Sequence, residues 1–272
     1  MIEKAFENRR FLYSRAARPI RILAEYLEPL SRFERYQVAN TVVLLGSSRL
    51  HPPDVARARL REAEQALAAD PTNPALRHRY EVARARLELA HYYDEAVEVA
   101  RRITEWNLQR PPHRRFLVCT GAGPGIMEAA NRGSALAGGP SIGLGIELNN
   151  VAETANPYVS PELLFLFHYF FMRKFWFVYL AKAVILFPGG FGTLDELFEV
   201  LTLKQTGKLK KQLPVILYGR SFWERLIDWD LLTAHGLIDP GDRGLFMYCD
   251  SPDEVTQVLF PWLESIEPDT WD

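Results

Sequence analysis

The 272-residue sequence predicts an α/β protein, with a doubly wound and mainly parallel sheet that carries helices on both faces. Three observations indicate this fold class. Several short runs are hydrophobic at every position rather than at alternate positions, as in parallel strands that are covered on both sides. Helical patterns separate these runs, and glycine-rich turns follow three of them directly. We therefore expect one Rossmann-like domain over residues 1–272, with ligands bound at the carboxyl ends of the strands.

The elements can be assigned in chain order. Residues 1–40 are expected to form helices that cover the sheet. Helices are also expected between strands, at residues 125–137 and 194–206. The expected strands are the short apolar runs at residues 41–45, 116–119, 141–147, 183–187 and 214–218.

Residues 52–106 differ in composition and predict a helical hairpin inserted within the domain. Residues 54–69 are rich in Ala, Arg, Glu and Leu, the prolines at residues 70–74 interrupt the helix, and a helical pattern resumes over residues 75–106. An apolar stripe in the second part can pack within the chain or against another subunit, and both interpretations stay open.

A long apolar segment, residues 163–187, could by length cross a bilayer. Arg173 and Lys174 lie near its middle, where each charge costs roughly 2.5 to 3.5 kcal/mol on insertion. A membrane span is therefore disfavoured, and we expect a buried helix over residues 163–182 followed by the strand at residues 183–187.

Charge and cysteine content exclude several classes of protein. The 32 basic and 34 acidic residues give a net charge of −2, which provides no electrostatic footprint for nucleic acid or for an anionic membrane. Cys119 and Cys249 are too few for a disulfide framework or a thiolate zinc site. The start of the chain shows no signal-peptide pattern, so we expect a cytoplasmic protein, and no metal-ligand cluster is apparent.

The most specific motif is PGGFGTLDE at residues 188–196. Its glycines, Gly189, Gly190 and Gly192, allow a ligand to approach the backbone, and Thr193 is placed to cap the following helix. A glycine turn between a strand and a helix N-terminus binds anions well, so we expect a phosphate here. The Gly-Lys-Ser/Thr sequence that ends the P-loop of nucleoside triphosphatases is absent, so hydrolysis of nucleoside triphosphates is disfavoured.

Charged side chains that could complete this site lie on two helical segments. Glu196 and Glu199 share one face of the helix after the glycine turn, and the N-terminal field should keep Glu196 ionised. Arg173 and Lys174 need an anionic partner in their apolar surroundings. Arg173 is the better candidate for a substrate contact because its planar group grips carboxylate or phosphate with two hydrogen bonds.

Two more glycine turns are expected to face the same pocket. Gly46 and Ser47 follow the first strand, within Gly-Ser-Ser-Arg. The segment TGAGPGIME, residues 120–128, follows the second strand, but it departs from a dinucleotide-binding motif because Ile126 stands where that motif needs glycine. The ligand contacts expected from this segment are Gly121, Gly123, Gly125 and Met127.

These motifs together resemble the LOG ("Lonely Guy") family of nucleoside 5′-monophosphate phosphoribohydrolases, often described as lysine decarboxylase-like. The resemblance extends over residues 20–260 apart from the hairpin. It implies a Rossmann-like homodimer or larger homo-oligomer, without cofactor, that hydrolyses the N-glycosidic bond of purine or cytokinin nucleoside monophosphates such as AMP. It also implies that Arg173 and Glu196 are the catalytic pair and that Gly189, Gly190, Gly192 and Thr193 bind phosphate, with Lys174 and Glu199 as further contacts.

The expected chemistry agrees with this resemblance. Cleavage of a ribosyl C–N bond builds positive charge on the sugar, which the carboxylate of Glu196 can stabilise. Arg173 keeps its proton and therefore positions substrate rather than donating a proton. Departures from the family pattern are the long hairpin, Ala122 in place of glycine, and Asn149 where many relatives have proline.

Two other functions stay open. One is a non-enzymatic carrier of a nucleotide or of the molybdenum cofactor, because such carriers share a glycine-rich phosphate turn. The other is amino-acid decarboxylation, which would need a lysine in a Schiff base with pyridoxal phosphate. Lys174 and Lys182 are the nearest candidates for that role, although charge pairing explains each equally well.

Overall fold

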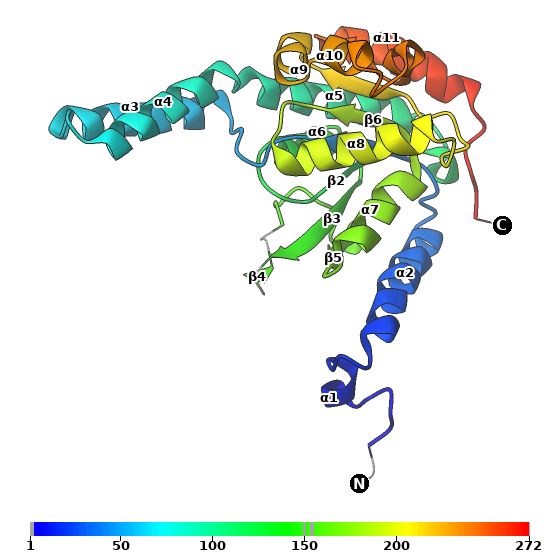
Figure 1. The fold of residues 1–272 in the computed structure, drawn as a ribbon. Helices are drawn as coiled ribbons and strands as arrows, with labels where there is room; N and C mark the ends of the chain where they lie inside the picture. Colours follow the sequence, from blue (N-terminus) through cyan, green and yellow to red (C-terminus); the bar gives the residue numbers. More distant parts are fainter. Residues whose placement is uncertain (1–2, 149–150, 153–154, 272) are drawn as a thin grey trace.

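A computed structural model describes residues 3–148, 151–152 and 155–271. Its sheet has seven parallel strands in the order β5-β3-β2-β1-β6-β7-β8, and the short β4 adds antiparallel to β3 (Figure 1). The strands are β1 Thr41–Leu45, β2 Leu117–Thr120, β3 Ser141–Leu148, β4 Val151–Ala152, β5 Leu164–Phe167, β6 Ala181–Leu186, β7 Val215–Tyr218 and β8 Met247–Cys249.

Some of the described helices cover the two faces of this sheet, and others project from it (Figure 1). The described helices are α1 Arg9–Leu12, α2 Arg18–Arg35, α3 Pro53–Ala69, α4 Pro74–Glu88, α5 His91–Leu108, α6 Ile126–Leu136, α7 Phe170–Tyr179, α8 Phe191–Gln205, α9 Arg220–Leu226, α10 Trp229–Ala234 and α11 Pro252–Ser265. One face packs against α2, α7 and α8, with Trp176 and Leu197 in its core. The other packs against α5, α6 and α11, with Tyr93 and Leu259 in its core. The predicted doubly wound α/β fold is confirmed.

The strand order reverses beside β1. The chain builds β1, β2 and β3 outward in one direction and then returns to place β6 on the other side of β1. Leu45 at the end of β1 pairs with Leu186 at the end of β6, so the loops that follow these strands start side by side. In open α/β sheets the crevice at such a reversal is the usual place for a ligand.

The apolar segment at residues 163–187 differs from its prediction. Its first part is strand β5, in which Phe165 and Phe167 are buried while Leu166 is 54% exposed, and only Phe170–Tyr179 is helical. A continuous apolar run does not distinguish a buried strand from a buried helix, so the single helix predicted over residues 163–182 was wrong. Among the described residues, no helix is both long enough and apolar enough to span a bilayer.

The inserted hairpin is shorter than predicted, because residues 75–106 form two helices rather than one. The helical conformation is interrupted at Leu89 and Ala90, between α4 and α5. Helix α5 buries Tyr93, Val99 and Ile103 in the core, whereas α4 buries none of its residues and pairs with α3. Helices α3 and α4 therefore form a hairpin that projects from the body, while α5 is a layer helix (Figure 1).

The N-terminal helices cover the sheet only in part. Phe33, near the end of α2, is buried in the core against α7 and β5. Towards the beginning of α2, Ile20, Leu23 and Leu27 are exposed, and α1 lies farther from the sheet (Figure 1). The second half of α2 therefore packs against the sheet, whereas its first half presents apolar side chains to solvent.

Candidate active site

A cleft of about 660 Å³ opens where β1 and β6 end. Three glycine turns and the facing sides of α7 and α8 line it, as the strand order requires. The sequence-predicted residues that the structure brings together here are Gly46, Ser47, Gly121, Met127, Arg173, Gly189, Gly190, Gly192, Thr193 and Glu196.

Gly123 and Gly125 support the cleft without lining it. Gly125 has φ of +72°, and a Cβ there would lie 2.3 Å from the carbonyl oxygen of Ser47. The next amide, that of Ile126, donates to the same oxygen at 3.1 Å. These contacts hold the turn after β1 against the start of α6, so the Gly125 position serves packing.

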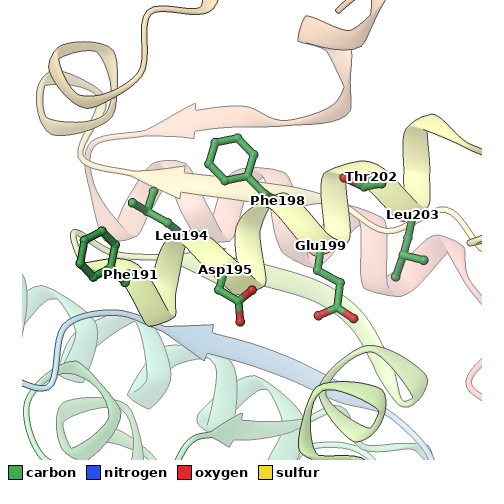
Figure 2. A pocket seen from close by; sticks show the side chains of 7 residues that line it. All are labelled: Phe191, Leu194, Asp195, Phe198, Glu199, Thr202 and Leu203. Atoms are coloured by element: carbon green, nitrogen blue, oxygen red, sulfur yellow. The ribbon is translucent and has the colours of Figure 1, made fainter. Parts of the chain in front are cut away.

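Lys174 and Glu199 also lie outside the cleft. The Lys174 ammonium is 2.8 Å from Glu199 and 3.0 Å from Asp195, which links α7 to α8. Figure 2 shows Asp195 and Glu199 projecting from one side of α8 and Phe198 from the other, beside a surface depression of about 480 Å³. The predicted substrate contacts of Lys174 and Glu199 are therefore not supported by their positions.

The glycine turn after β6 leaves room for a ligand. Helix α8 starts at Phe191, so its N-cap is Gly190, and Thr193 lies in the first turn instead of capping the helix as predicted. A Cβ on Gly189 would meet the Thr193 hydroxyl at 2.0 Å, whereas Cβ atoms on Gly190 and Gly192 would meet nothing within 4 Å. The first amides of a helix have no intrahelical acceptor, so the open side of this turn can cradle an anion.

Arg173 and Glu196 face each other inside the cleft. Their nearest nitrogen and oxygen are 3.9 Å apart, and their side chains are 15% and 5% exposed. The Arg173 guanidinium also lies over the rings of Phe170 and Phe177, at 5.5 and 5.4 Å from the ring centres. This pair places a fixed positive charge and a carboxyl group on one apolar wall.

Burial raises the pKa of Glu196 to about 7, although Arg173 and Lys174 pull it downward. Loss of water outweighs the attraction of these two cations, so the carboxyl is less readily ionised than its place near a helix N-terminus led us to expect. Near neutral pH Glu196 exists in both protonation states. A carboxyl group poised in this way can take up a proton during a reaction and release it afterwards.

A buried network of amides shapes the turn after β2. The Asn156 side-chain amide donates to the carbonyl oxygens of Ala122 and Gly123 and to Asn131, which also contacts Thr120. Ala122 has φ of +63°, a conformation that favours glycine, and this network holds it there. No pattern in the sequence indicates that Asn156 and Asn131 position the turn. Asn149 lies outside the described residues.

Comparison with known proteins identifies the relatives of this chain. A family model described as "Possible lysine decarboxylase" matches residues 127–259. A pyrimidine/purine nucleotide 5′-monophosphate nucleosidase of Escherichia coli K12 is 36% identical over 173 residues, which cover 58% of this chain and 37% of that protein. A cytokinin riboside 5′-monophosphate phosphoribohydrolase of Rhodococcoides fascians is 30% identical over 134 residues, which cover 49% of this chain and 67% of that protein.

Among solved structures, the molybdenum cofactor binding protein of Rippkaea orientalis matches with a TM-score of 0.44 and 18% identity, over 62% of this chain and 86% of that chain. The match to the E. coli relative spans little more than a third of that protein, at 37% of its length.

Proposed function

This chain belongs to the LOG family of possible lysine decarboxylases, and from that premise we propose that it hydrolyses nucleoside 5′-monophosphates to free base and ribose 5-phosphate. The observation that carries the proposal is the single cleft in which a phosphate cradle, Gly190–Thr193, adjoins a buried Arg173–Glu196 pair. A mononucleotide has the two features that this cleft matches, an anionic end and a sugar carbon that becomes cationic.

In the proposed reaction, the substrate phosphate binds the first amides of α8 beside Gly190 and Gly192. Water attacks the anomeric carbon of ribose as the bond to the base breaks, and the bonding electrons leave with the base. Ionised Glu196 takes up the proton of the attacking water and stabilises the positive charge on the sugar. The departing base takes a proton from solvent, and Glu196 afterwards returns the proton that it gained, so the products are the neutral base and ribose 5-phosphate. Arg173 holds the substrate and keeps Glu196 oriented.

Decarboxylation has weaker support than hydrolysis. Lys174 is held by Asp195 and Glu199, and Lys182 is held by Asp269 at 2.6 Å. Both lysines are therefore engaged as charge partners, and neither lines the cleft. A lysine that forms a Schiff base needs a free amine facing the substrate.

We also infer a cytoplasmic homo-oligomer. The exposed apolar residues Ile20, Leu23 and Leu27 of α2 lie near a groove to which Phe171 and Phe175 of α7 contribute, and burial of such a surface favours association of two copies. Leu23→Asp should shift the sedimentation coefficient to that of a monomer. An unchanged coefficient would place the subunit contact elsewhere. The described cysteines are free and buried, as suits a reducing compartment.

The decisive experiment is incubation of the purified chain with AMP, an N6-prenyl analogue, CMP and adenosine, with chromatography of the products. We expect free base and ribose 5-phosphate from at least one monophosphate. Adenosine should react at least about a hundredfold more slowly, because it lacks the group that the cradle binds. Calorimetric binding of AMP without release of base would contradict hydrolysis.

A further inference from the structure

A second pocket lies at the root of the hairpin, between α3, α4 and the turn after β1. Its volume is about 390 Å³. We refer to it as the basic pocket, because its lining holds one acid, Glu62, against four arginines and two histidines: Arg49, Arg59, Arg79, Arg86, His51 and His78. The chain as a whole carries a net charge of −2, so this concentration of cations is local.

The cations of the basic pocket are poorly neutralised. Glu62 lies 4.0 Å from Arg79, at the limit of an ion pair. Within the part of the chain that the structure describes, Arg49, Arg59 and Arg86 form no ion pair. Burial lowers the pKa of Arg86, and Arg49 and Arg59 lower it further, so these guanidinium groups are close enough to repel one another.

The pocket also has an uncharged wall. Ala56 of α3 and Val82 and Ala83 of α4 lie between the arginines. His51 is half-buried, and burial together with Arg59 lowers its pKa, so at neutral pH it contributes a neutral ring. A ligand that fits here carries several adjacent negative charges and can also have a flat apolar part.

From this arrangement, we propose that the basic pocket binds a ligand with linked phosphates, either a nucleoside polyphosphate or an inorganic polyphosphate. Arginine forks match phosphate oxygens with paired hydrogen bonds, and three guanidinium groups without counter-charges need more negative charge than one phosphate supplies. The site is distinct from the cradle on α8, which lies in the other cavity.

The two cavities share one side chain. Arg49 lines both the basic pocket and the active-site cleft, and it follows Ser47, whose hydroxyl accepts a hydrogen bond from the Arg49 amide at 3.1 Å. A polyphosphate that engages Arg49 changes the charge facing the cleft. Binding at either cavity therefore alters affinity at the other, and by linkage the effect is reciprocal.

The first test is calorimetry of the full chain with tripolyphosphate, ATP and inorganic phosphate. Two double variants carry the same change in charge on the same two helices: Arg59→Gln/Arg86→Gln inside the pocket, and Arg57→Gln/Arg84→Gln on exposed positions outside it. We expect the first variant to bind tripolyphosphate at least about tenfold more weakly than the wild type, and the second to bind it within about twofold.

The outcomes distinguish a nucleotide from an inorganic phosphate chain as the ligand, and the basic pocket from the active-site cleft as its binding site. Tighter binding of ATP than of tripolyphosphate identifies a nucleotide, and equal binding identifies the phosphate chain. The proposal is overturned if both double variants weaken binding equally, if phosphate binds as tightly as tripolyphosphate, or if Arg173→Gln abolishes binding while the pocket variant does not. None of these outcomes requires hydrolytic activity, so they do not depend on the proposed function.

The coupling is tested by titrating AMP with and without saturating tripolyphosphate. We expect the AMP affinity of the wild type to change by about fivefold, within the usual range of coupling between sites, and that of Arg59→Gln/Arg86→Gln to stay unchanged. Identical AMP affinities in the wild type would disprove communication through Arg49.

Discussion

The active-site cleft and the basic pocket share Arg49, but their arginines differ in pairing: the cleft holds a buried ion pair, and the basic pocket, within the described ranges of the chain, holds arginines without acidic partners. In the cleft, Arg173 faces Glu196 at 3.9 Å and both side chains are nearly inaccessible to water. In the basic pocket, Arg59 is exposed and Arg86 is half-buried, and among the described residues neither has an acidic partner.

The contrast shows two ways in which a protein can hold charge in a binding site: as a buried pair or as unpaired cations in contact with water. A buried pair fixes the position of its charges, and removal of one partner leaves the other uncompensated in an apolar wall. Cations that are exposed or half-buried keep part of their hydration, so they can stay unpaired until an anion binds, despite the repulsion that lowers the pKa of Arg86. The fixed charges of the cleft therefore suit catalysis, and the solvated, unpaired charges of the basic pocket suit reversible binding of an anion.

The largest effect should follow Glu196→Gln, which keeps the shape of the side chain and removes its charge. We expect kcat for AMP to fall by roughly 100- to 1000-fold, the scale of a lost electrostatic contact in a transition state. Affinity for ribose 5-phosphate should stay within about threefold, because the cradle at Gly190 is intact.

The matched control is Glu199→Gln, on the same helix three residues later. Glu199 pairs with Lys174 outside the cleft, so its loss should leave kcat within about threefold. Equal losses of turnover in the two variants would indicate a general effect of charge on α8 and would remove the special role of Glu196.

The next effect is a dependence on pH. Burial raises the pKa of Glu196 to about 7, and the proposed reaction uses its ionised form. We therefore expect kcat/KM to fall about tenfold for each pH unit below 7 and to level off above it, with this limb missing in Glu196→Gln. A value of kcat/KM that falls as pH rises above 7 would instead indicate that Glu196 acts as a proton donor.

The same shift links pH to folding. The native state favours protonated Glu196, since its pKa lies above the ordinary value of 4.5, so the stabilisation is present at low pH and is lost as pH rises through about 7. Between pH 5 and 8, the wild type should lose about 2 kcal/mol more unfolding free energy than Glu196→Gln. Urea unfolding of both proteins measures this difference, and parallel pH curves would contradict the raised pKa.

Two adjacent glycines provide a smaller and more local comparison within the cleft. Gly189→Ala forces a Cβ against Thr193, so we expect a loss of about 1–3 kcal/mol in unfolding free energy. Gly190→Ala meets no protein atom within 4 Å and should keep its stability, but its methyl group occupies the space of the phosphate and should raise KM about tenfold. Thermal unfolding and kinetics distinguish the two, and equal stabilities would contradict the packing of Gly189.

Much of the cleft could be predicted from the sequence, because its turns directly follow strands whose apolar residues are contiguous. Gly46, Gly121 and Gly189 each follow such a strand, and parallel strands bring their carboxyl ends to one edge. The protonation state of Glu196 could not be predicted, because the sequence places it near a helix N-terminus without showing that the side chain is only 5% exposed.

The basic pocket could not be predicted, for a different reason. Arg49 and Arg86 are far apart in the sequence, and they line one pocket in a structure where α4 ends at Glu88 and α5 begins at His91. No glycine or proline marks that interruption. The core buries an apolar face of α5, whereas no residue of α4 is buried and α4 packs along α3.

The smallest effect tests the contrast in charge directly. Arg86→Gln removes one of several mutually repelling cations, so we expect the unfolding free energy to rise by about 0.3–0.5 kcal/mol at low salt. The gain should shrink strongly in 0.5 M sodium chloride, because salt screens the repulsion between charges that are in contact with solvent. Arg84→Gln, exposed on the same helix and outside the basic pocket, should change stability less. A loss of stability in Arg86→Gln that salt does not affect would mean that the stem of Arg86 packs against α3, and that its charge is already compensated in the free protein.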